Sequence, residues 1–352
     1  MAKVLMKGNE AVAKAAIEAG CKYFFGYPIT PQNEIPEYMA KELPKNDGVF
    51  VQAESEVSAI NMIYGGAGCG ARVMTSSSSP GIALKQEGIT YLAGAELPAV
   101  IVNMMRGGPG LGGIQPSQAD YFMSTRGGGN GDYRTPVYAP ASIQEAVDMV
   151  MEAFEVADYY RTPVMVVADG MIGQMMEPVE FKAPKKRDLP KKDWATTGTN
   201  GERKPNIINS LFLDPQALED HCFKLDRRYK EIEENEVKYE MYKTEDADLV
   251  FVAYGTTSRI VKNTVEALRE QGIKAGLIRP ITLWPFPNKA FNEIPAAKNL
   301  LVVEMSTGQM IDDVKIANEG RLPIDFFGRT GGMIPTPVEI MDKAMEVIGG
   351  AK

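Results

Sequence analysis

Four polar or glycine-rich segments in the first third of the chain contain the residue types that could do chemistry, and each follows a short apolar stretch. They are YPITP (27–31), QAESE (52–56), TSSSSPG (75–81) and RGGPGLGG (106–113). Together they offer carboxylates, hydroxyls, a guanidinium and closely spaced glycines. Ligands of open parallel sheets bind in the loops beyond the carboxyl ends of the strands. If the apolar stretches are neighbouring parallel strands, the four segments meet at one edge and form a candidate site.

Glu54 and Glu56 stand at the start of a predicted helix, EVSAINMIYGGAG (56–68). Acids in the first turn commonly stabilise the helix macrodipole, and this is one interpretation of both residues. Their position at the carboxyl end of a strand also allows one of them to point into a cleft. A carboxylate that is partly desolvated in a cleft is suited to proton exchange.

Arg106 follows the apolar stretch AVIVNMM (99–105). A guanidinium at the end of a buried strand costs free energy unless it meets an anion. That anion is either a structural carboxylate or the carboxylate of a substrate, and the sequence leaves both open. The serines of TSSSSPG (75–81) can likewise cap the following helix or donate hydrogen bonds to a bound anion.

The glycines of GPGLGG (108–113) formally match the dinucleotide-binding pattern GxGxxG. Pro109 interrupts the pattern, and no helix opens after it to present its N-terminus to a pyrophosphate. We therefore interpret this segment as a tightly turned loop near the site. A dinucleotide site is the weaker alternative.

Composition excludes several classes of function. The net charge of −8, from 38 Lys and Arg against 46 Asp and Glu, argues against binding of nucleic acid, which needs a basic face. His221 is the single histidine, which excludes metal sites built on several histidines and argues against a Ser-His-Asp hydrolase. Cys21, Cys69 and Cys222 are too few to hold an iron–sulfur cluster within this chain. No targeting segment or apolar run of membrane length is visible, so we expect a cytoplasmic protein with reduced thiols.

The elements that must position these residues alternate between helix and strand. Along residues 8–169, helical segments such as NEAVAKAAIEA alternate with apolar stretches such as LPAVIVNMM. This predicts an α/β fold with a mostly parallel sheet and helices on both faces. A polar connector then leads to a charged helical strut, LEDHCFKLDRRYKEIEENEVKYEMY (218–242), before the alternation resumes. We predict three parts, at residues 1–185, 186–246 and 247–352.

The order of these motifs resembles a known family. YPITP, an acidic pair opening the helix ESEVSAINMIYGGAG, TSSSSPG and a strand ending in MRGGP are similar to the alpha-type subunit of thiamine-diphosphate-dependent 2-oxoacid:ferredoxin oxidoreductases. The resemblance covers nearly the whole chain, including YGTTSR, IRPITLWPFP and VEMSTGQM. The region from LFLDPQALEDH to the strut is most similar to the branched-chain (2-oxoisovalerate, or 3-methyl-2-oxobutanoate) type, with the 2-oxoglutarate type as the alternative. The resemblance implies a thiamine pyrimidine-binding domain at 1–185 and a transketolase C-terminal-like domain at 247–352.

The resemblance also assigns roles to residues in the oxidative decarboxylation of a 2-oxoacid with CoA to acyl-CoA and CO2, which reduces ferredoxin. Glu56 matches the glutamate that contacts the aminopyrimidine ring of thiamine diphosphate, where a shared carboxyl proton favours the reactive tautomer. Ile29 and Thr30 match cofactor-binding positions, and Thr30 and Arg106 match substrate-binding positions. A cation and a hydroxyl there would hold the carboxylate of the 2-oxoacid.

One expected motif of thiamine enzymes is missing. ADGMIG (168–173) lacks the first glycine of the GDG motif that binds thiamine diphosphate and Mg²⁺, and no paired Asn follows. The resemblance therefore implies a beta subunit that carries the GDG motif and holds Mg²⁺, so we predict no metal site in this chain. Iron–sulfur clusters are expected in partner subunits, among which we count a gamma subunit and a ferredoxin-like subunit. Ferredoxin, CoA and a 2-oxoacid are further expected partners, and nucleic acid and membrane are not.

Two other interpretations stay open. The chain could belong to a different thiamine class, such as a transketolase-like or phosphonopyruvate-like enzyme, although the lack of histidines near the site argues against transketolase chemistry. It could also be a non-catalytic subunit that only completes an assembly.

Overall fold

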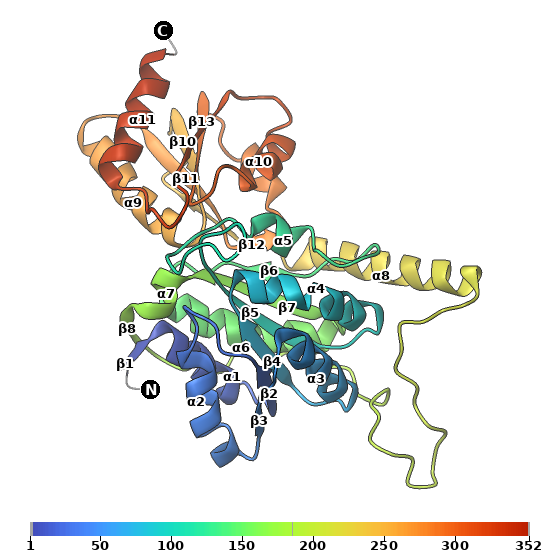
Figure 1. Ribbon diagram of the computed structural model, residues 1–352. Coiled ribbons are helices and arrows are strands. Elements are labelled where there is room, and N and C mark those ends of the chain that lie inside the picture. Colours follow the sequence, from blue (N-terminus) through green and yellow to red (C-terminus); the bar gives the residue numbers. More distant parts are fainter. Residues whose placement is uncertain (1–2, 185, 351–352) are drawn as a thin grey trace.

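The structure, a computed structural model, describes residues 3–184 and 186–350. It contains a larger α/β unit built from the first part of the chain and a smaller α/β unit near the C-terminus (Figure 1). A long helix and an irregular segment connect the two in sequence. This arrangement confirms the predicted α/β fold class.

A seven-stranded sheet forms the centre of the larger unit, in the order β12-β6-β7-β5-β4-β2-β3. Its neighbouring strands are parallel except for the antiparallel pair of β12 and β6. β4, β5 and β7 are buried along their whole length, which explains the largely apolar sequences of β5 (AVIVNMM) and β7 (PVMVVAD), whereas β4 (VMTSS) ends in buried hydroxyl side chains. The bounds are β2 (Tyr23–Gly26), β3 (Val49–Gln52), β4 (Val73–Ser77), β5 (Ala99–Met105), β6 (Val137–Tyr138), β7 (Pro163–Asp169) and β12 (Thr282–Trp284).

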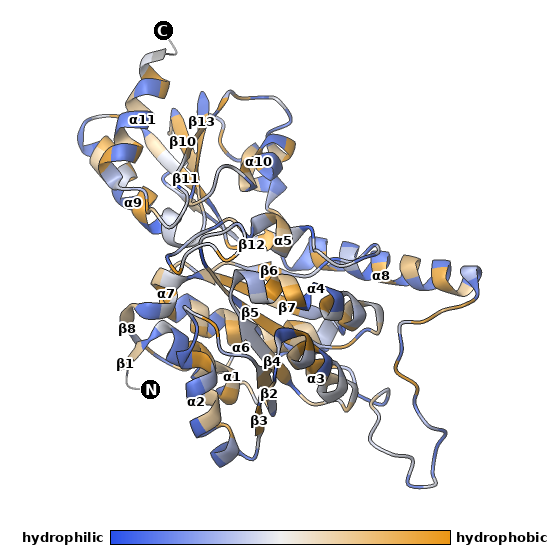
Figure 2. Cartoon of the chain, in the orientation of Figure 1, coloured by the Kyte–Doolittle hydropathy of each residue, from blue (hydrophilic) through white to orange (hydrophobic). Residues whose placement is uncertain are grey.

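Two pairs of helices cover this sheet (Figure 1). α1 packs against α6, and α3 packs against α4. Figure 2 shows hydrophobic residues concentrated in the central strands between them. The helices of this unit are α1 (Gly8–Glu18), α2 (Glu34–Glu42), η1 (Pro44–Asn46), α3 (Glu56–Gly68), α4 (Ser79–Gly94), α5 (Tyr121–Thr125), α6 (Ile143–Tyr160) and α7 (Gly170–Gln174). A small antiparallel ribbon of β1 (Val4–Lys7) and β8 (Met176–Val179) lies beside them.

The smaller unit has a five-stranded sheet in the order β14-β13-β10-β11-β9, with β9 antiparallel to β11 and the other neighbours parallel. α9 and α11 pack against each other beside a second cluster of buried apolar residues. Its elements are β9 (Tyr239–Tyr242), β10 (Leu249–Val252), α9 (Gly255–Glu270), β11 (Ala275–Pro280), η2 (Asn288–Asn292), β13 (Asn299–Glu304), α10 (Met310–Asn318), β14 (Ile324–Gly328) and α11 (Pro337–Gly350).

Two features join the units firmly. β12 leaves the sequence of the smaller unit and pairs with β6 at the edge of the larger sheet. Gln118 bridges the units as well: its Nε2 donates to the Tyr254 carbonyl at 2.9 Å, and its Oε1 accepts from the Met305 N–H at 2.9 Å. The segment around Gln118, which lies between β5 and α5, is therefore packed against the smaller unit.

The predicted strut is α8 (Pro215–Asn235), the long yellow helix in Figure 1. The prediction that this helix continues to Tyr242 is wrong, because residues 239–242 form β9 and pair with the edge strand β11. Backbone pairing at that edge replaces the helical hydrogen bonds there. No helix in the described part of the chain combines the length and the apolar character needed to cross a membrane.

Candidate active site

The four polar segments singled out in the sequence meet at the carboxyl edge of the larger sheet. They follow β5, β4, β2 and β3, which are consecutive neighbours in that sheet. Direct contacts link three of them: Arg106 Nη1 donates to the Thr30 carbonyl at 2.9 Å, and Ser79 Oγ donates to the Arg106 carbonyl at 3.2 Å. Residues from distant parts of the sequence therefore share one site.

The two candidate carboxylates differ sharply in environment. Glu54 is exposed, whereas Glu56 is only 7% exposed. α3 begins at Glu56 because Ser55 caps it, with Ser55 Oγ accepting from the Ser58 N–H at 3.2 Å. Within the described residues, the Glu56 carboxylate has no hydrogen-bond or ion-pair partner. Because a buried carboxylate without a donor is costly, this position is suited to a donor from a bound ligand.

A glycine makes room for this carboxylate. A Cβ atom added at Gly81 would lie 2.0 Å from Ser77 Oγ and 2.8 Å from Glu56 Oε1. The first turn of α4 therefore approaches Glu56 closely only because residue 81 has no side chain. The close approach places Glu56, Ser77 and the start of α4 around one small polar space.

The serines do not behave as simple helix caps. Ser78 is the N-cap residue of α4, but its side chain makes no capping hydrogen bond. The hydroxyls of Ser77 and Ser78 are buried and have no partner in the described chain. Ser79 Oγ instead bonds to Asp120 at 2.5 Å, besides its bonds to the backbone of Arg106. The capping interpretation is thus wrong for Ser78, and the buried hydroxyls of Ser77 and Ser78 have no partner in the turn between β4 and α4.

Arg106 is held by backbone carbonyls. Its Nη1 and Nη2 donate to the carbonyls of Thr30 (2.9 Å) and Leu111 (3.1 Å), and its Nε is buried without a partner. No carboxylate in the described chain forms an ion pair with it. The nearby Asp120 is bonded to Ser79 and Asn103, and burial raises the pKa of this carboxyl despite those bonds and the Arg106 charge. The guanidinium charge is therefore left without a bonded protein anion.

Thr30 and Ile29 lie in the turn after β2. The Thr30–Pro31 peptide bond is cis, and Thr30 Oγ1 accepts from Asn33 Nδ2 at 3.4 Å. Ile29 is half-buried, and its carbonyl accepts from the Gln32 N–H at 3.0 Å. The turn thus presents the Thr30 carbonyl to Arg106 while its hydroxyl keeps a free proton.

A cavity of about 660 Å³ opens beside Thr30. Side chains from the larger unit and one residue of the smaller unit, Ile334, line it. Glu34 is its one charged residue, and it accepts hydrogen bonds from Lys7, Asn9 and Gln174. Although partial burial alone would raise the pKa of Glu34, these bonds lower it. The lining is Thr30, Pro31, Asn33, Glu34, Ile114, Gln115, Pro116, Gly170, Met171, Gln174, Met175 and Ile334.

Sequence reasoning missed Lys85, which is fully buried in α4. Its Nζ donates to Thr75 Oγ1 at 2.8 Å and to the Ser76 carbonyl at 3.0 Å. Burial lowers the pKa of this ammonium to about 7, although the Glu56 charge raises it in part. The signal was present: Lys85 lies at helical spacing between Ile82 and Ile89, both buried, so it belongs to the inward stripe of α4.

The incomplete GDG motif has a structural role here. Asp169 ends β7 and caps α7, accepting from the N–H groups of Met171 (2.9 Å) and Ile172 (3.3 Å). Burial raises the pKa of Asp169, although these bonds oppose the rise. The described residues contain no group of three or more His, Cys, Asp or Glu side chains that could hold a metal ion.

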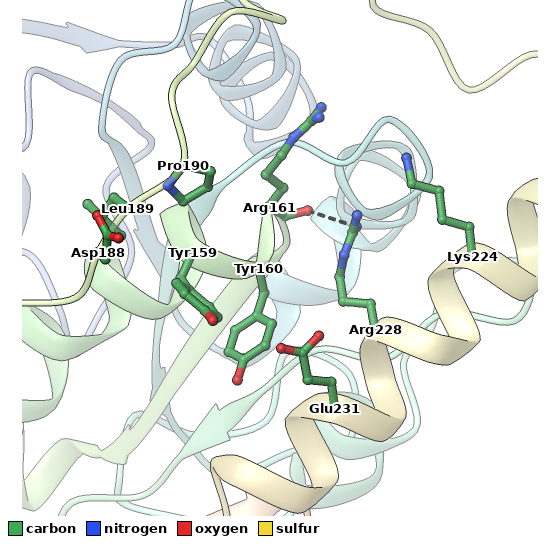
Figure 3. A pocket seen from close by; sticks show the side chains of 9 residues that line it. All are labelled: Tyr159, Tyr160, Arg161, Asp188, Leu189, Pro190, Lys224, Arg228 and Glu231. Carbon is green, nitrogen blue, oxygen red and sulfur yellow. Dashed lines mark hydrogen bonds between the residues drawn. The ribbon is translucent and has the colours of Figure 1, made fainter.

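A second cavity, of about 480 Å³, lies between the end of α6 and α8, away from the sheet edge (Figure 3). Its basic residues are already engaged. Lys224 and Arg228 both pair with Glu96, and Arg228 also donates to the Arg161 carbonyl, the dashed contact in Figure 3. These contacts attach α8 to the larger unit, so we interpret this cavity as part of a structural joint.

Comparison with known proteins identifies the family. Residues 14–244 match the family described as pyruvate flavodoxin/ferredoxin oxidoreductase, thiamine diphosphate-binding, and residues 247–340 match pyruvate:ferredoxin oxidoreductase core domain II. The chain is 49% identical to ketoisovalerate oxidoreductase subunit VorB of Methanothermobacter thermautotrophicus, with 99% of both chains covered. It is 38% identical to 2-oxoglutarate synthase subunit KorA of Methanocaldococcus jannaschii, covering 95% of this chain and 97% of that one.

Solved structures agree with this result. A 2-oxoglutarate:ferredoxin oxidoreductase from Magnetococcus marinus matches with a TM-score of 0.88 and 26% identity. The match covers 98% of this chain and 65% of the longer Magnetococcus chain. A split-gene transketolase, at 14% identity and a TM-score of 0.59 over 98% of each chain, shares the fold alone. The chain therefore belongs to the pyruvate flavodoxin/ferredoxin oxidoreductase family, as an alpha-type subunit of a 2-oxoacid:ferredoxin oxidoreductase with its thiamine-diphosphate-binding domain.

Proposed function

We propose that this chain supplies one half of a shared active site for oxidative decarboxylation of a branched-chain 2-oxoacid, with 2-oxoisovalerate as the preferred substrate. The products are an acyl-CoA and CO2, and two electrons pass to ferredoxin. The observation that carries the proposal is the buried, unpartnered Glu56 carboxylate at the same sheet edge as the Arg106 guanidinium. Glu56 accepts and donates a proton, and Arg106 binds the anionic carboxylate of the substrate.

Glu56 fits the aminopyrimidine end of thiamine diphosphate. The carboxylate is buried and without a donor, and the orphaned hydroxyls of Ser77 and Ser78 lie in the same strand-to-helix turn. A ring nitrogen that donates to Glu56 would satisfy it. When bound, thiamine diphosphate supplies the nucleophilic carbon and the electron sink that decarboxylation needs. Glu56 itself holds and shares the proton, while Ile29 and Thr30 form the turn at the next strand.

Arg106 and Thr30 are proposed to hold the substrate carboxylate. Two N–H groups of the guanidinium are used on carbonyls, which fixes its plane, and the remaining N–H groups can donate to an anion. The Thr30 hydroxyl can add a further hydrogen bond. Orienting the carboxylate in this way places the bond that breaks in a fixed direction.

The cavity beside Thr30 favours a branched aliphatic side chain over a second carboxylate. Ile114, Met171, Met175 and Ile334 contribute apolar surface, and the lining contains no Lys or Arg. Its one charged residue, Glu34, is an acid whose pKa is lowered, so it is ionised at neutral pH. Burying the distal carboxylate of 2-oxoglutarate there would leave it unpaired and next to a like charge.

The remaining parts of the reaction are proposed to belong to partners. Because Asp169 serves as a helix cap, we assign Mg²⁺ and the pyrophosphate to a beta subunit with a GDG motif. We assign the iron–sulfur clusters to a ferredoxin-like subunit, with a gamma subunit completing the complex. The three cysteines are free thiols, which supports the cytoplasm as the proposed location. Alone, the chain should bind thiamine diphosphate weakly, and tight Mg²⁺-dependent binding in calorimetry would contradict this division.

The catalytic role is tested with Glu56→Gln in the reconstituted complex, with Glu54→Gln as the matched control. We expect Glu56→Gln to assemble normally and to lose ~10²–10⁴-fold in turnover and in hydrogen–deuterium exchange at the thiazolium C2. The exposed Glu54 should matter little. Equal slowing in both variants would refute the assignment, and full activity of Glu56→Gln would favour a non-catalytic assembly subunit.

The substrate class is tested with Met171→Arg, which places a cation in the cavity wall. Its matched control is Met176→Arg, because Met176 is 53% exposed on β8 and does not line the cavity. We expect only Met171→Arg to raise kcat/KM for 2-oxoglutarate relative to 2-oxoisovalerate. If the wild-type complex already prefers 2-oxoglutarate, the proposed substrate is wrong.

A further inference from the structure

Asn9 is a fully buried amide at the start of α1, and it contacts the turn that follows β2. Its Nδ2 donates to the Pro31 carbonyl at 2.8 Å and to Glu34 Oε2 at 2.7 Å. An amide nitrogen carries two hydrogens, so both are used. Its Oδ1 is buried without a partner in the described chain. Because burial of a polar group is costly unless it is hydrogen-bonded, the two donated bonds are what favours an asparagine at this position.

Gln174, the last residue of α7, donates to the same two acceptors. Its Nε2 lies 3.0 Å from the Pro31 carbonyl oxygen and 2.9 Å from Glu34 Oε2. Asn9 and Gln174 together form an amide clamp, in which two side chains from different helices share one carbonyl and one carboxylate oxygen. Bonds to a carboxylate are stronger than bonds between neutral groups, so Glu34 anchors the clamp that holds Pro31.

The two halves of the clamp are fixed relative to each other because α1 begins directly against α7. The Gly8 N–H donates to the Met175 carbonyl at 3.1 Å. A Cβ atom added at Gly8 would lie only 1.9 Å from the Ile172 carbonyl oxygen, so this close approach requires a glycine. Asn9 follows Gly8 in the chain and is therefore placed by the contact between the two helices.

The clamp is linked to the proposed site through the turn itself. Pro31 directly follows Thr30, whose carbonyl accepts from Arg106 Nη1 at 2.9 Å. Neighbouring carbonyls of the turn are thus held from two sides, one by the clamp and one by the guanidinium. Asn9 is fully buried and does not line the cavity beside Thr30, so it can influence a ligand only through the turn.

We propose that Asn9 is a positioning residue for the reaction: it holds the turn after β2 in the conformation in which the Thr30 carbonyl fixes the Arg106 guanidinium. Gln174 supports it from α7. The consequence for the substrate rests on the proposed function, in which Arg106 binds the carboxylate of the 2-oxoacid. The effect on the turn is a property of this chain alone.

The effect on the turn is measured by hydrogen–deuterium exchange on the purified full chain without cofactor. The Gln32 N–H is hydrogen-bonded within the turn, so its exchange reports whether the turn is held. We expect Asn9→Ala to speed exchange in the segment 27–35 by ~10-fold or more. Asn318→Ala is the matched control, because Asn318 is 2% exposed and its side chain bonds to the backbone of Leu322 in the smaller unit. It should leave exchange in this segment unchanged.

The effect on the substrate is measured in the reconstituted complex. Asn9→Ala should raise KM and lower kcat/KM by ~10-fold for 2-oxoisovalerate, 2-oxoglutarate and pyruvate alike. In the Arg106→Lys background the same substitution should cost less than ~3-fold, because two residues that act through one contact are not additive. A merely structural role would reduce the amount of assembled complex and leave KM unchanged. Asn318→Ala should also leave KM unchanged.

The outcomes separate the two proposals. Wild-type exchange of the turn in Asn9→Ala would overturn the inference, and so would losses that multiply in the double variant when Arg106→Lys is itself impaired. Faster exchange together with an unaffected KM in Arg106→Lys would refute the proposed substrate role of Arg106 and leave the clamp intact.

A second variant covers a failure of Asn9→Ala to fold. Asn9→Leu fills a similar volume without any donor, and the same exchange result is expected. If neither variant folds, Gln174→Ala decides, because Gln174 is exposed and supplies the other half of the clamp. Its turn must then exchange faster than that of the wild type, and an unchanged rate would overturn the inference.

Discussion

Arg106→Lys keeps a positive charge at the substrate end of the site but removes the planar fork. Arginine uses two separate nitrogens on the carbonyls of Thr30 and Leu111 and still has N–H groups left for a ligand. A lysine has one nitrogen, which cannot reach both carbonyls and a carboxylate with the same geometry. The expected loss is one charge-assisted hydrogen bond to the substrate, about 1.5–3 kcal/mol. This corresponds to a ~10–150-fold fall in kcat/KM.

The assay is steady-state reduction of ferredoxin by the reconstituted complex with 2-oxoisovalerate, 2-oxoglutarate and pyruvate. We expect KM to rise and kcat/KM to fall by a similar factor for all three, because each carries the same carboxylate next to its carbonyl. Arg126→Lys is the matched control, since Arg126 is partly exposed and pairs with Asp313 at 3.1 Å away from the site. An unchanged KM, or a change in preference among the acids, would show that Arg106 is a structural or side-chain-reading residue.

Three further predictions concern neighbouring features. Gly81→Ala should lower turnover by at least tenfold without loss of assembly, because its Cβ displaces the Glu56 carboxylate; unchanged kinetics would contradict the close approach. Burial alone would raise the pKa of Glu96, but its basic partners on α8 lower it to about 2. Glu96→Gln should therefore lower the free energy of unfolding by about 2 kcal/mol at pH 7, allowing for solvent screening. In urea titrations, this difference from the wild type should shrink as the pH falls from about 4.5 towards 2. Burial raises the pKa of Cys21 to about 12, so at pH 8 a thiol reagent should label the exposed Cys69 and reach Cys21 only after unfolding.

Periodicity predicted the parts of the fold that local sequence determines. The long helices were visible because their apolar residues recur at helical spacing, and the buried strands β5 and β7 were visible as nearly continuous apolar runs. β6 and β12 could not be predicted, because strands of two and three residues are too short to show a period and form only by pairing with a neighbouring strand. β9 was taken for helix because its four residues, YEMY, directly follow a charged helical pattern and are too few to show a period, and the edge of β11 decides its conformation.

The candidate site was predictable to the level of residues but not of contacts. Because Glu56, Thr30 and Arg106 each follow the carboxyl end of a parallel strand, they lie at one edge of the sheet whatever the conformations of the loops. The carbonyl partners of Arg106 come from two loops, whose conformations no local pattern specifies. Lys85 was overlooked because lysine is rarely buried, and only the hydroxyl and carbonyl of β4 make its burial tolerable.

The pairing of β12 with β6 has a consequence for synthesis on the ribosome. The chain emerges from its N-terminus, so β2 to β7 are available long before Thr282–Trp284 leave the exit tunnel. Until then β6 is an open strand edge, which another nascent chain could pair with. A truncated product that stops before residue 282 would keep that edge permanently. The protein is thus expected to need residues up to Trp284 outside the tunnel before its larger sheet has all its strands, and fragments that end earlier should aggregate instead of accumulating as a folded domain.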